Sequence, residues 1–215
     1  MFPISDSAKS IRFPFINIFL IAITIVIFYL QFSAIDEGRF IYTYAVVPAT
    51  IHLINLTSFL PFVTSIFLHG NLLHLLSNMW FLWIFGDNVE GQMNPFFYVI
   101  LYLGSGIAGG LLQYVFTPNS GIPMLGASGA VAGALGAYYV LFPQHKIKTL
   151  IPFFGFFQLV DIPAAYMLGY WILLQILFGA LSLPGMGEQG GVAFFAHIGG
   201  FITGIVFAKV FVRNK

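Results

Sequence analysis

A serine and a histidine lie within two apolar stretches of this chain, where reactive side chains are rare. Ser128 follows Gly126 and Ala127 at the start of a run of small residues, and His197 lies a few residues inside the last apolar stretch. Ionisable groups within a membrane are costly and usually functional. A serine hydroxyl is a weak nucleophile until a base takes its proton, and an imidazole is a suitable base. The pair therefore predicts acyl-transfer chemistry, with Ser128 as nucleophile and His197 as general base.

The composition indicates an integral membrane protein. Of the 215 residues, 59% are hydrophobic and only 7% are charged, whereas a soluble domain carries roughly 25% charged residues. The net charge of +1 gives no basic patch for nucleic acid, so none is expected as a partner. The absence of cysteine excludes thiol catalysis, disulfides and Cys-ligated zinc. No H-E-x-x-H motif is present, and we expect neither a metal nor a cofactor.

Six apolar runs bounded by Pro, Gly, Asn or charged residues predict six membrane-spanning helices. We place them at residues 15–32, 71–85, 96–116, 128–142, 164–183 and 194–212. Since no polar linker divides the runs, the sequence predicts an all-α fold, a polytopic six-transmembrane-helix bundle. We expect one domain over residues 1–215, in which residues 1–14 form a short cytoplasmic N-terminal segment.

Basic residues predict the orientation, because cytoplasmic loops of membrane proteins carry most of the Lys and Arg. An even number of spans puts both termini on one side, and a cytoplasmic location for them leaves only Arg39 outside. The basic residues that then lie inside are Lys9, Arg12, Lys146, Lys148, Lys209, Arg213 and Lys215. We expect both termini in the cytoplasm, and the compact core without extra domains favours a bacterial plasma membrane.

Three connections between the predicted spans are unusual in composition. Residues 33–70 form a long, largely apolar loop, which we expect in the outer membrane interface. Residues 149–160 are rich in Phe and flanked by Pro, which favours an interfacial turn. Residues 184–191 are rich in glycine and are expected to form a mobile connection.

Four polar residues are predicted to meet at one depth in the membrane. At 1.5 Å per residue from the cytoplasmic ends, Ser128 lies about 21 Å up, His197 about 20 Å and His74 about 17 Å. Asn78 is one turn below His74 on the same helix face. An oxyanion needs hydrogen-bond donors, which the side chains of His74 and Asn78 and the free Ser128 N–H at a helix start can supply. No acidic residue is expected at this depth, so the sequence predicts a Ser–His dyad without a carboxylate.

Small residues on two of the spans explain how the dyad could form. Gly129, Gly133 and Gly136 give the fourth span a smooth face, and Gly200 and Gly204 form a GxxxG pair on the sixth. Such faces let two helix backbones approach closely. We expect this approach to bring the serine and the histidine within hydrogen-bond distance.

These residues, in this order, resemble the rhomboid family of intramembrane serine proteases. The resemblance runs from Phe59 to the C-terminus. It rests on four elements: His69 with His74-Leu-Leu-Ser-Asn78, Gly86 and Glu90; Gly126-Ala127-Ser128-Gly129; Ala196-His197-Ile198-Gly199-Gly200 with Gly204; and Trp171 with Gln175.

The resemblance implies a function and site roles. Ser128 would be the nucleophile, His197 the general base, and His74 and Asn78 part of the oxyanion region. Substrate helices would enter beside the fifth span, so the expected partners are transmembrane protein substrates and the lipid bilayer. No oligomeric state is predicted.

The chain departs from the family pattern in two places. The first loop has only Gly38-Arg39-Phe40 near the position of a Trp-Arg pair found in many members. Ala132 lies where some members place a tyrosine that stacks on the histidine, which leaves open what orients the His197 ring.

Two other functions stay open at this point. A catalytically inactive relative would bind transmembrane segments, but such a protein would be expected to have lost Ser128 or His197. A transporter needs a polar route through both leaflets, whereas few polar groups follow Asn78 on its span and internal repeats are not evident.

We interpret His69 as a support for a loop or for the site. The acidic residues near the cytoplasmic edge are interpreted as interface anchors: Asp87, Glu90 and Asp161.

Overall fold

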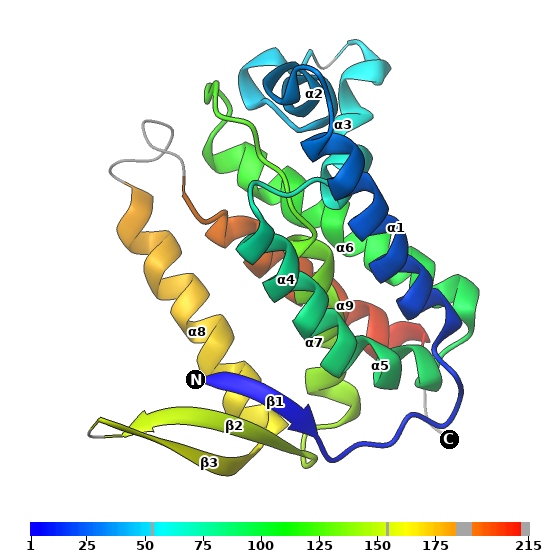
Figure 1. The fold of residues 1–215 in the computed structure, drawn as a ribbon, viewed down its shortest axis with the longest axis vertical. Coiled ribbons are helices and arrows are strands. Elements are labelled where there is room, and N and C mark those ends of the chain that lie inside the picture. The colour runs from blue at the N-terminus through cyan, green and yellow to red at the C-terminus, as the bar shows by residue number, and fades with distance from the viewer. Residues whose placement is uncertain (53, 154, 184–190, 212–215) are drawn as a thin grey trace.

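The computed structural model describes residues 1–52, 54–153, 155–183 and 191–211 (Figure 1). Its named elements are β1 (Phe2–Asp6), α1 (Phe15–Phe32), α2 (Glu37–Tyr44), α3 (Pro61–Thr64), α4 (Leu72–Phe81), a π-helical turn (Leu82–Gly86), α5 (Asp87–Gln92), α6 (Pro95–Phe116), α7 (Ser128–Leu141), β2 (Lys146–Phe153), β3 (Phe156–Pro163), α8 (Ala164–Ser182) and α9 (Phe194–Phe211). Three short 3-10 turns lie at Pro48–Thr50, Leu56–Phe59 and Ser65–Phe67. The predicted loop 184–191, except for its last residue, and the last residue of the predicted span 194–212 lie outside the described residues.

The protein is a mostly helical, polytopic membrane protein. In the described part of the chain, four helices are long and apolar enough to cross a membrane: α1, α6, α8 and α9. A fifth span results if Leu56–Phe67 and Leu72–Gln92, which meet at an angle of 82°, are taken together. The predicted fourth span is α7, whose 14 residues cover about 21 Å at 1.5 Å per residue. In the described residues, length and composition therefore give four or five spans, and the predicted count of six is not confirmed.

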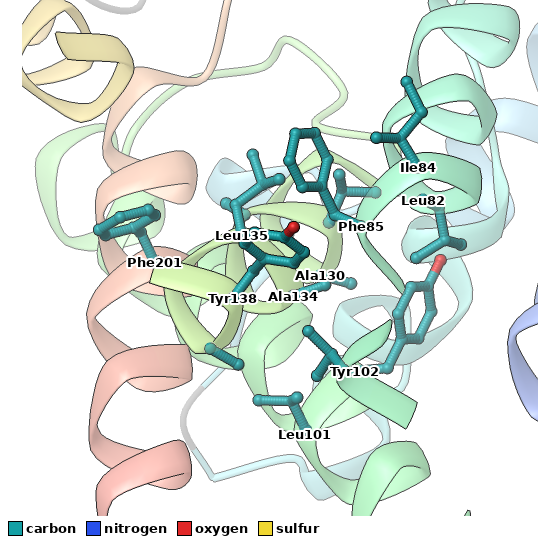
Figure 2. Close-up of a cluster of buried hydrophobic side chains, with 14 of the residues drawn as sticks. Leu82, Ile84, Phe85, Leu101, Tyr102, Ala130, Ala134, Leu135, Tyr138 and Phe201 are labelled. Atoms are coloured by element: carbon teal, nitrogen blue, oxygen red, sulfur yellow. The ribbon is translucent and has the colours of Figure 1, made fainter. Parts of the chain in front are cut away.

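Helix α7 lies at the centre of the packed bundle. Every residue from 129 to 138 is buried, because α6, α9, α8 and the π-helical turn pack around the helix. Figure 2 shows Ala130, Ala134, Leu135 and Tyr138 of α7 among buried side chains from the neighbouring helices. A helix that is hydrophobic on all faces is buried, either in a protein core or in a membrane, and α7 is enclosed by protein.

The predicted close approach of the fourth and sixth spans is present between α7 and α9. A Cβ atom on Gly200 would overlap the carbonyl oxygen of Gly129, and one on Gly204 would overlap that of Gly133. In the reverse direction, a Cβ atom on Gly136 of α7 would overlap the carbonyl oxygen of Phe201 on α9. The two backbones are therefore in direct contact at three points, and a glycine stands at each of them.

The prediction of an all-α fold is confirmed only in part: the chain is mostly helical, but an antiparallel sheet with the order β1-β2-β3 lies at one end of the bundle (Figure 1). The predicted turn at 149–160 is part of a hairpin in which Lys146 pairs with Pro163 and Phe153 with Phe156. The first four residues of its first strand, 146–149, alternate between exposed and buried side chains, as in a half-buried strand. The Phe-rich sequence and its prolines concealed this period of two.

Strand β1, within the segment predicted as a short N-terminal extension, ties the sheet to the helices. The Trp80 indole N–H of α4 donates to the carbonyl oxygen of Pro3 at 2.8 Å, and its ring stacks on Phe2 at 5.9 Å. The Asp6 carboxylate accepts from the Tyr138 hydroxyl of α7 and from the Asn88 amide. Burial raises the pKa of the Asp6 carboxyl above its ordinary value, although the hydrogen bond from Tyr138 opposes that shift.

Glu90 has a different role from the interface anchor that the sequence suggested. Its side chain is only 5% exposed. Its two carboxylate oxygens accept from the backbone N–H groups of Ile16 at 3.0 Å and Asn17 at 2.7 Å. These donors belong to the first turn of α1, which has no capping side chain of its own. Glu90 therefore caps α1 and complements its dipole.

Candidate active site

Ser128 is the first residue of α7, and a tight turn before it fixes its position. Gly126 has a φ of +127°, a conformation that favours glycine. Its N–H donates to the carbonyl oxygen of Ser65 at 2.9 Å, and a Cβ atom there would lie 2.6 Å from the His74 ring. Since the first N–H groups of a helix have no intrahelical partner, the Ser128 N–H is available as a donor.

His69 supports this turn from the buried side, as its interpretation from sequence suggested. The side chain is fully buried, and its Nε2 accepts from the Ala127 N–H at 3.4 Å. Its ring meets the His74 ring edge to face at 5.1 Å. Gln31 of α1 makes two hydrogen bonds to the backbone of His69. Its amide NH₂ group donates to the His69 carbonyl oxygen at 2.8 Å, and its amide oxygen accepts from the His69 N–H at 3.2 Å.

Gln31 is a supporting residue that sequence reasoning missed. It is fully buried near the end of α1, outside the stretch that carries the family resemblance. The available signal was a single amide side chain at the end of an apolar run, where an unpaired polar group is costly. That signal indicates a partner for Gln31, but it does not identify His69 as that partner.

His74 and Asn78 lie on α4, one turn apart, as predicted. Asn71 caps this helix by accepting from the His74 N–H at 2.8 Å. Asn78 is 7% exposed, and its Nδ2 has no hydrogen-bond partner among the described residues. Buried donors are nearly always paired in proteins. The amide of Asn78 is therefore a donor that an acceptor entering the site can use.

A cavity of about 570 Å³ brings the predicted site residues together. Ser128, His197, His74 and Asn78 all line it, from α7, α9 and α4. None of its described lining residues is Asp or Glu, so no carboxylate faces the histidine from the cavity wall. Among the described residues, no group of three His, Cys, Asp or Glu side chains could hold a metal ion.

The expected hydrogen bond between the serine and the histidine is not formed. Among the described residues, the polar partner of the His197 ring is Gln175 of α8, whose Oε1 lies 2.7 Å from Nδ1. The Trp171 ring lies against the imidazole, with centroids 5.7 Å apart and planes tilted by 34°. The backbones of α7 and α9 meet at Gly129 and Gly200, and Ser128 and His197 line the same cavity without a hydrogen bond between them. Catalytic hydrogen bonds are often long until substrate binds, when they tighten.

The fold and the cavity define a membrane protein with a serine and a histidine at a shared internal site, and sequence comparison gives its family. A model of the rhomboid domain matches residues 56–214. The chain belongs to the rhomboid family.

Named relatives agree with this assignment. Rhomboid protein 1, mitochondrial, of Saccharomyces cerevisiae is 29% identical over 157 residues, which cover 70% of this chain and 41% of that protein. Rhomboid-like protein 11, chloroplastic, of Arabidopsis thaliana is 30% identical over 159 residues, covering 71% of this chain and 52% of the relative. Rhomboid protease GluP of Bacillus subtilis is 38% identical over 86 residues, covering 40% of this chain and 16% of that protein.

These relatives extend well beyond the part that matches this chain, and two of them are named for a location other than the predicted one. The matched part of this chain spans about half or less of each relative's own length. Their names place one in mitochondria and one in chloroplasts. The expected bacterial plasma membrane therefore gains no support from them, whereas the apolar helices agree with an integral membrane protein.

Proposed function

We propose that this chain is an intramembrane serine endopeptidase that cleaves transmembrane segments near the outer face of the bilayer through a Ser128–His197 dyad. The observation that carries this proposal is the single cavity lined by Ser128, His197, His74 and Asn78. Its partners would be transmembrane protein substrates within the lipid bilayer, and both of its termini would be cytoplasmic. Membership of a family with a relative named as a protease supports the proposal.

The proposed reaction has two balanced steps. In the first, Ser128 Oγ attacks the scissile carbonyl carbon while His197 Nε2 takes the hydroxyl proton. The carbon–nitrogen bond then breaks, and His197 returns that proton to the leaving amine, which leaves an acyl ester on Ser128. In the second, His197 takes a proton from water, the hydroxide oxygen attacks the ester carbon, and the ester bond breaks as Ser128 regains its proton.

The cavity supplies donors for the negative charge that forms on the carbonyl oxygen. The Ser128 N–H, the His74 ring and the Asn78 amide come from two helices that the turn at Gly126 holds together. Donors that are already oriented stabilise an oxyanion without reorganising during the reaction. This arrangement favours acyl transfer over binding alone.

Replacing Asn78 with alanine is expected to lower kcat by on the order of 10²–10³ and to leave KM nearly unchanged, because one oxyanion donor is lost. The measurement is the cleavage rate of a labelled transmembrane peptide in liposomes at saturating substrate. Asn119→Ala, at an exposed position outside the cavity lining, is the matched control and should cleave at the normal rate. A normal kcat in Asn78→Ala would remove Asn78 from the oxyanion region.

Labelling with a fluorophosphonate separates the protease from an inactive binding protein. The probe forms a bond to an activated serine oxygen with loss of fluoride, so the wild-type chain should be labelled at Ser128 and Ser128→Ala should not. Peptide mass spectrometry identifies the labelled residue. An unlabelled wild-type chain that still binds transmembrane peptides would overturn the proposal and favour the catalytically inactive relative.

A further inference from the structure

The imidazole of His197 has two ring nitrogens, and a side chain of α8 forms a hydrogen bond with one of them. Nδ1 lies 2.7 Å from Gln175 Oε1, which is a short hydrogen bond. Gln175 is 9% exposed, so solvent competes little for this contact. A base for Ser128 would use the other nitrogen, Nε2, and only if that nitrogen carries a lone pair rather than a proton.

A second contact fixes which end of the Gln175 amide faces the histidine. Its Nε2 donates to the Trp171 carbonyl oxygen, one turn earlier on α8, at 3.4 Å. Turning the amide over would set its oxygen against that carbonyl oxygen and its NH₂ group against His197. The oxygen of Gln175 therefore faces Nδ1, and because an amide oxygen can only accept, Nδ1 carries the proton. The neutral ring then has its lone pair on Nε2.

We propose that Gln175 is a positioning residue that holds His197 in the tautomer and ring orientation needed for proton transfer from Ser128, with Trp171 packed against the ring. This inference rests on the proposed protease function. Gln175 would do here what a buried carboxylate does in a Ser-His-Asp triad, where it holds the imidazole in the correct tautomer. The amide does so without placing a charge among apolar helices, where an unpaired carboxylate is costly.

The packing of α7 explains why this support comes from α8. Ala132, one turn after Ser128, is fully buried, and its Cβ lies 3.3 Å from where a Cβ of Gly200 would be. An aromatic ring at Ala132 would have to enter the direct contact between α7 and α9. Helix α8 packs on α9, and Gln175 is buried while Leu173 and Ile176 on the same helix are exposed. The base is therefore oriented only while α8 stays packed against α9.

Two substitutions of Gln175 test this role. Gln175→Met keeps the length of the side chain but replaces the amide oxygen with a thioether sulfur, which is only a weak acceptor for the Nδ1 proton. It is expected to lower kcat roughly 10- to 100-fold with little change in KM, which is part of the 10²–10⁴ that a well-placed general base contributes. Gln175→Glu keeps an acceptor and should retain a kcat near that of the wild type at its own optimum.

The pH–rate profile distinguishes positioning from a merely structural role. A carboxylate beside Nδ1 stabilises the protonated imidazole, so the acid limb of the Gln175→Glu profile should move to higher pH. The other titratable group acting on His197 is His74 of α4, which both variants retain. Thr203→Val, which removes a side-chain hydrogen bond to Gly199 on α9, is the control and should keep the wild-type profile.

The outcomes separate this inference from the proposed function. Wild-type kcat in a folded Gln175→Met variant would overturn the inference, as would equal losses in both variants with an unmoved acid limb. If Gln175→Met does not fold, the profile of Gln175→Glu decides the question alone. Fluorophosphonate labelling of the wild-type chain tests the protease function itself, since it depends on Ser128 and is read without either variant.

Discussion

Ser128→Ala is expected to abolish cleavage of a transmembrane substrate in liposomes, and His197→Ala is expected to do the same. The first variant lacks the proposed nucleophile, and the second lacks the proposed general base, which lines the same cavity. In serine proteases such single losses cost on the order of 10⁴ or more in kcat, and because the two groups act as a unit, the double variant should lose no more than either single one. Product formation by purified protein, followed by gel or mass spectrometry, is the measurement.

The control for this experiment is Ser33→Ala, an exposed serine at the end of α1 that should cleave normally. Thermal unfolding of each purified variant shows whether the fold is retained. Substantial cleavage by either folded variant would contradict the proposed dyad. This result would not depend on the role proposed for Gln175.

Gly200→Ala is expected to disrupt both folding and activity. The added methyl group would overlap the carbonyl oxygen of Gly129, which is backbone and cannot rotate away. Overpacking of this kind costs about 1–3 kcal/mol of stability. The helices must separate at the point between Ser128 and His197, and a misplacement of about 1 Å can cost 10²-fold in rate. We expect a lower unfolding temperature and, in the folded fraction, a kcat reduced by about that factor.

A second glycine provides the matched control. Gly104 lies within α6, and a methyl group there would meet no described atom within 4 Å. Gly104→Ala should therefore keep activity and gain up to about 1 kcal/mol from the better helix propensity of alanine. If Gly200→Ala behaved like Gly104→Ala in both measurements, the backbone contact between α7 and α9 would not be what positions the dyad.

The sequence was sufficient to predict four of the polar residues that line the cavity. Ser128, His197, His74 and Asn78 were placed at one depth by counting along helices, and the structure confirms that they share a cavity. Helical rise is regular, so height within a bundle can be calculated from residue number. The glycine faces of α7 and α9 could also be predicted, because spacing along a helix determines which residues share a face.

Contacts between segments distant in sequence could not be predicted in the same way. The His197 ring was expected to bond to Ser128, but it bonds to Gln175, because helical periodicity does not determine side-chain rotamers between helices. Gln31 was missed because its partner is a backbone group 38 residues away. The sheet was missed because the apolar Phe of β3 are exposed at the end of the bundle, so its strand lacks the usual alternation.

The pairing of β1 with β2 has a consequence for the order of assembly. Asp6 pairs with Ile147, so about 140 residues are synthesised between the two strands. At roughly 5–20 residues per second, β1 waits on the order of 10–30 s for its neighbour to leave the ribosome. The β1–β2 pairing therefore joins the molecule only after α1 to α7 have been synthesised.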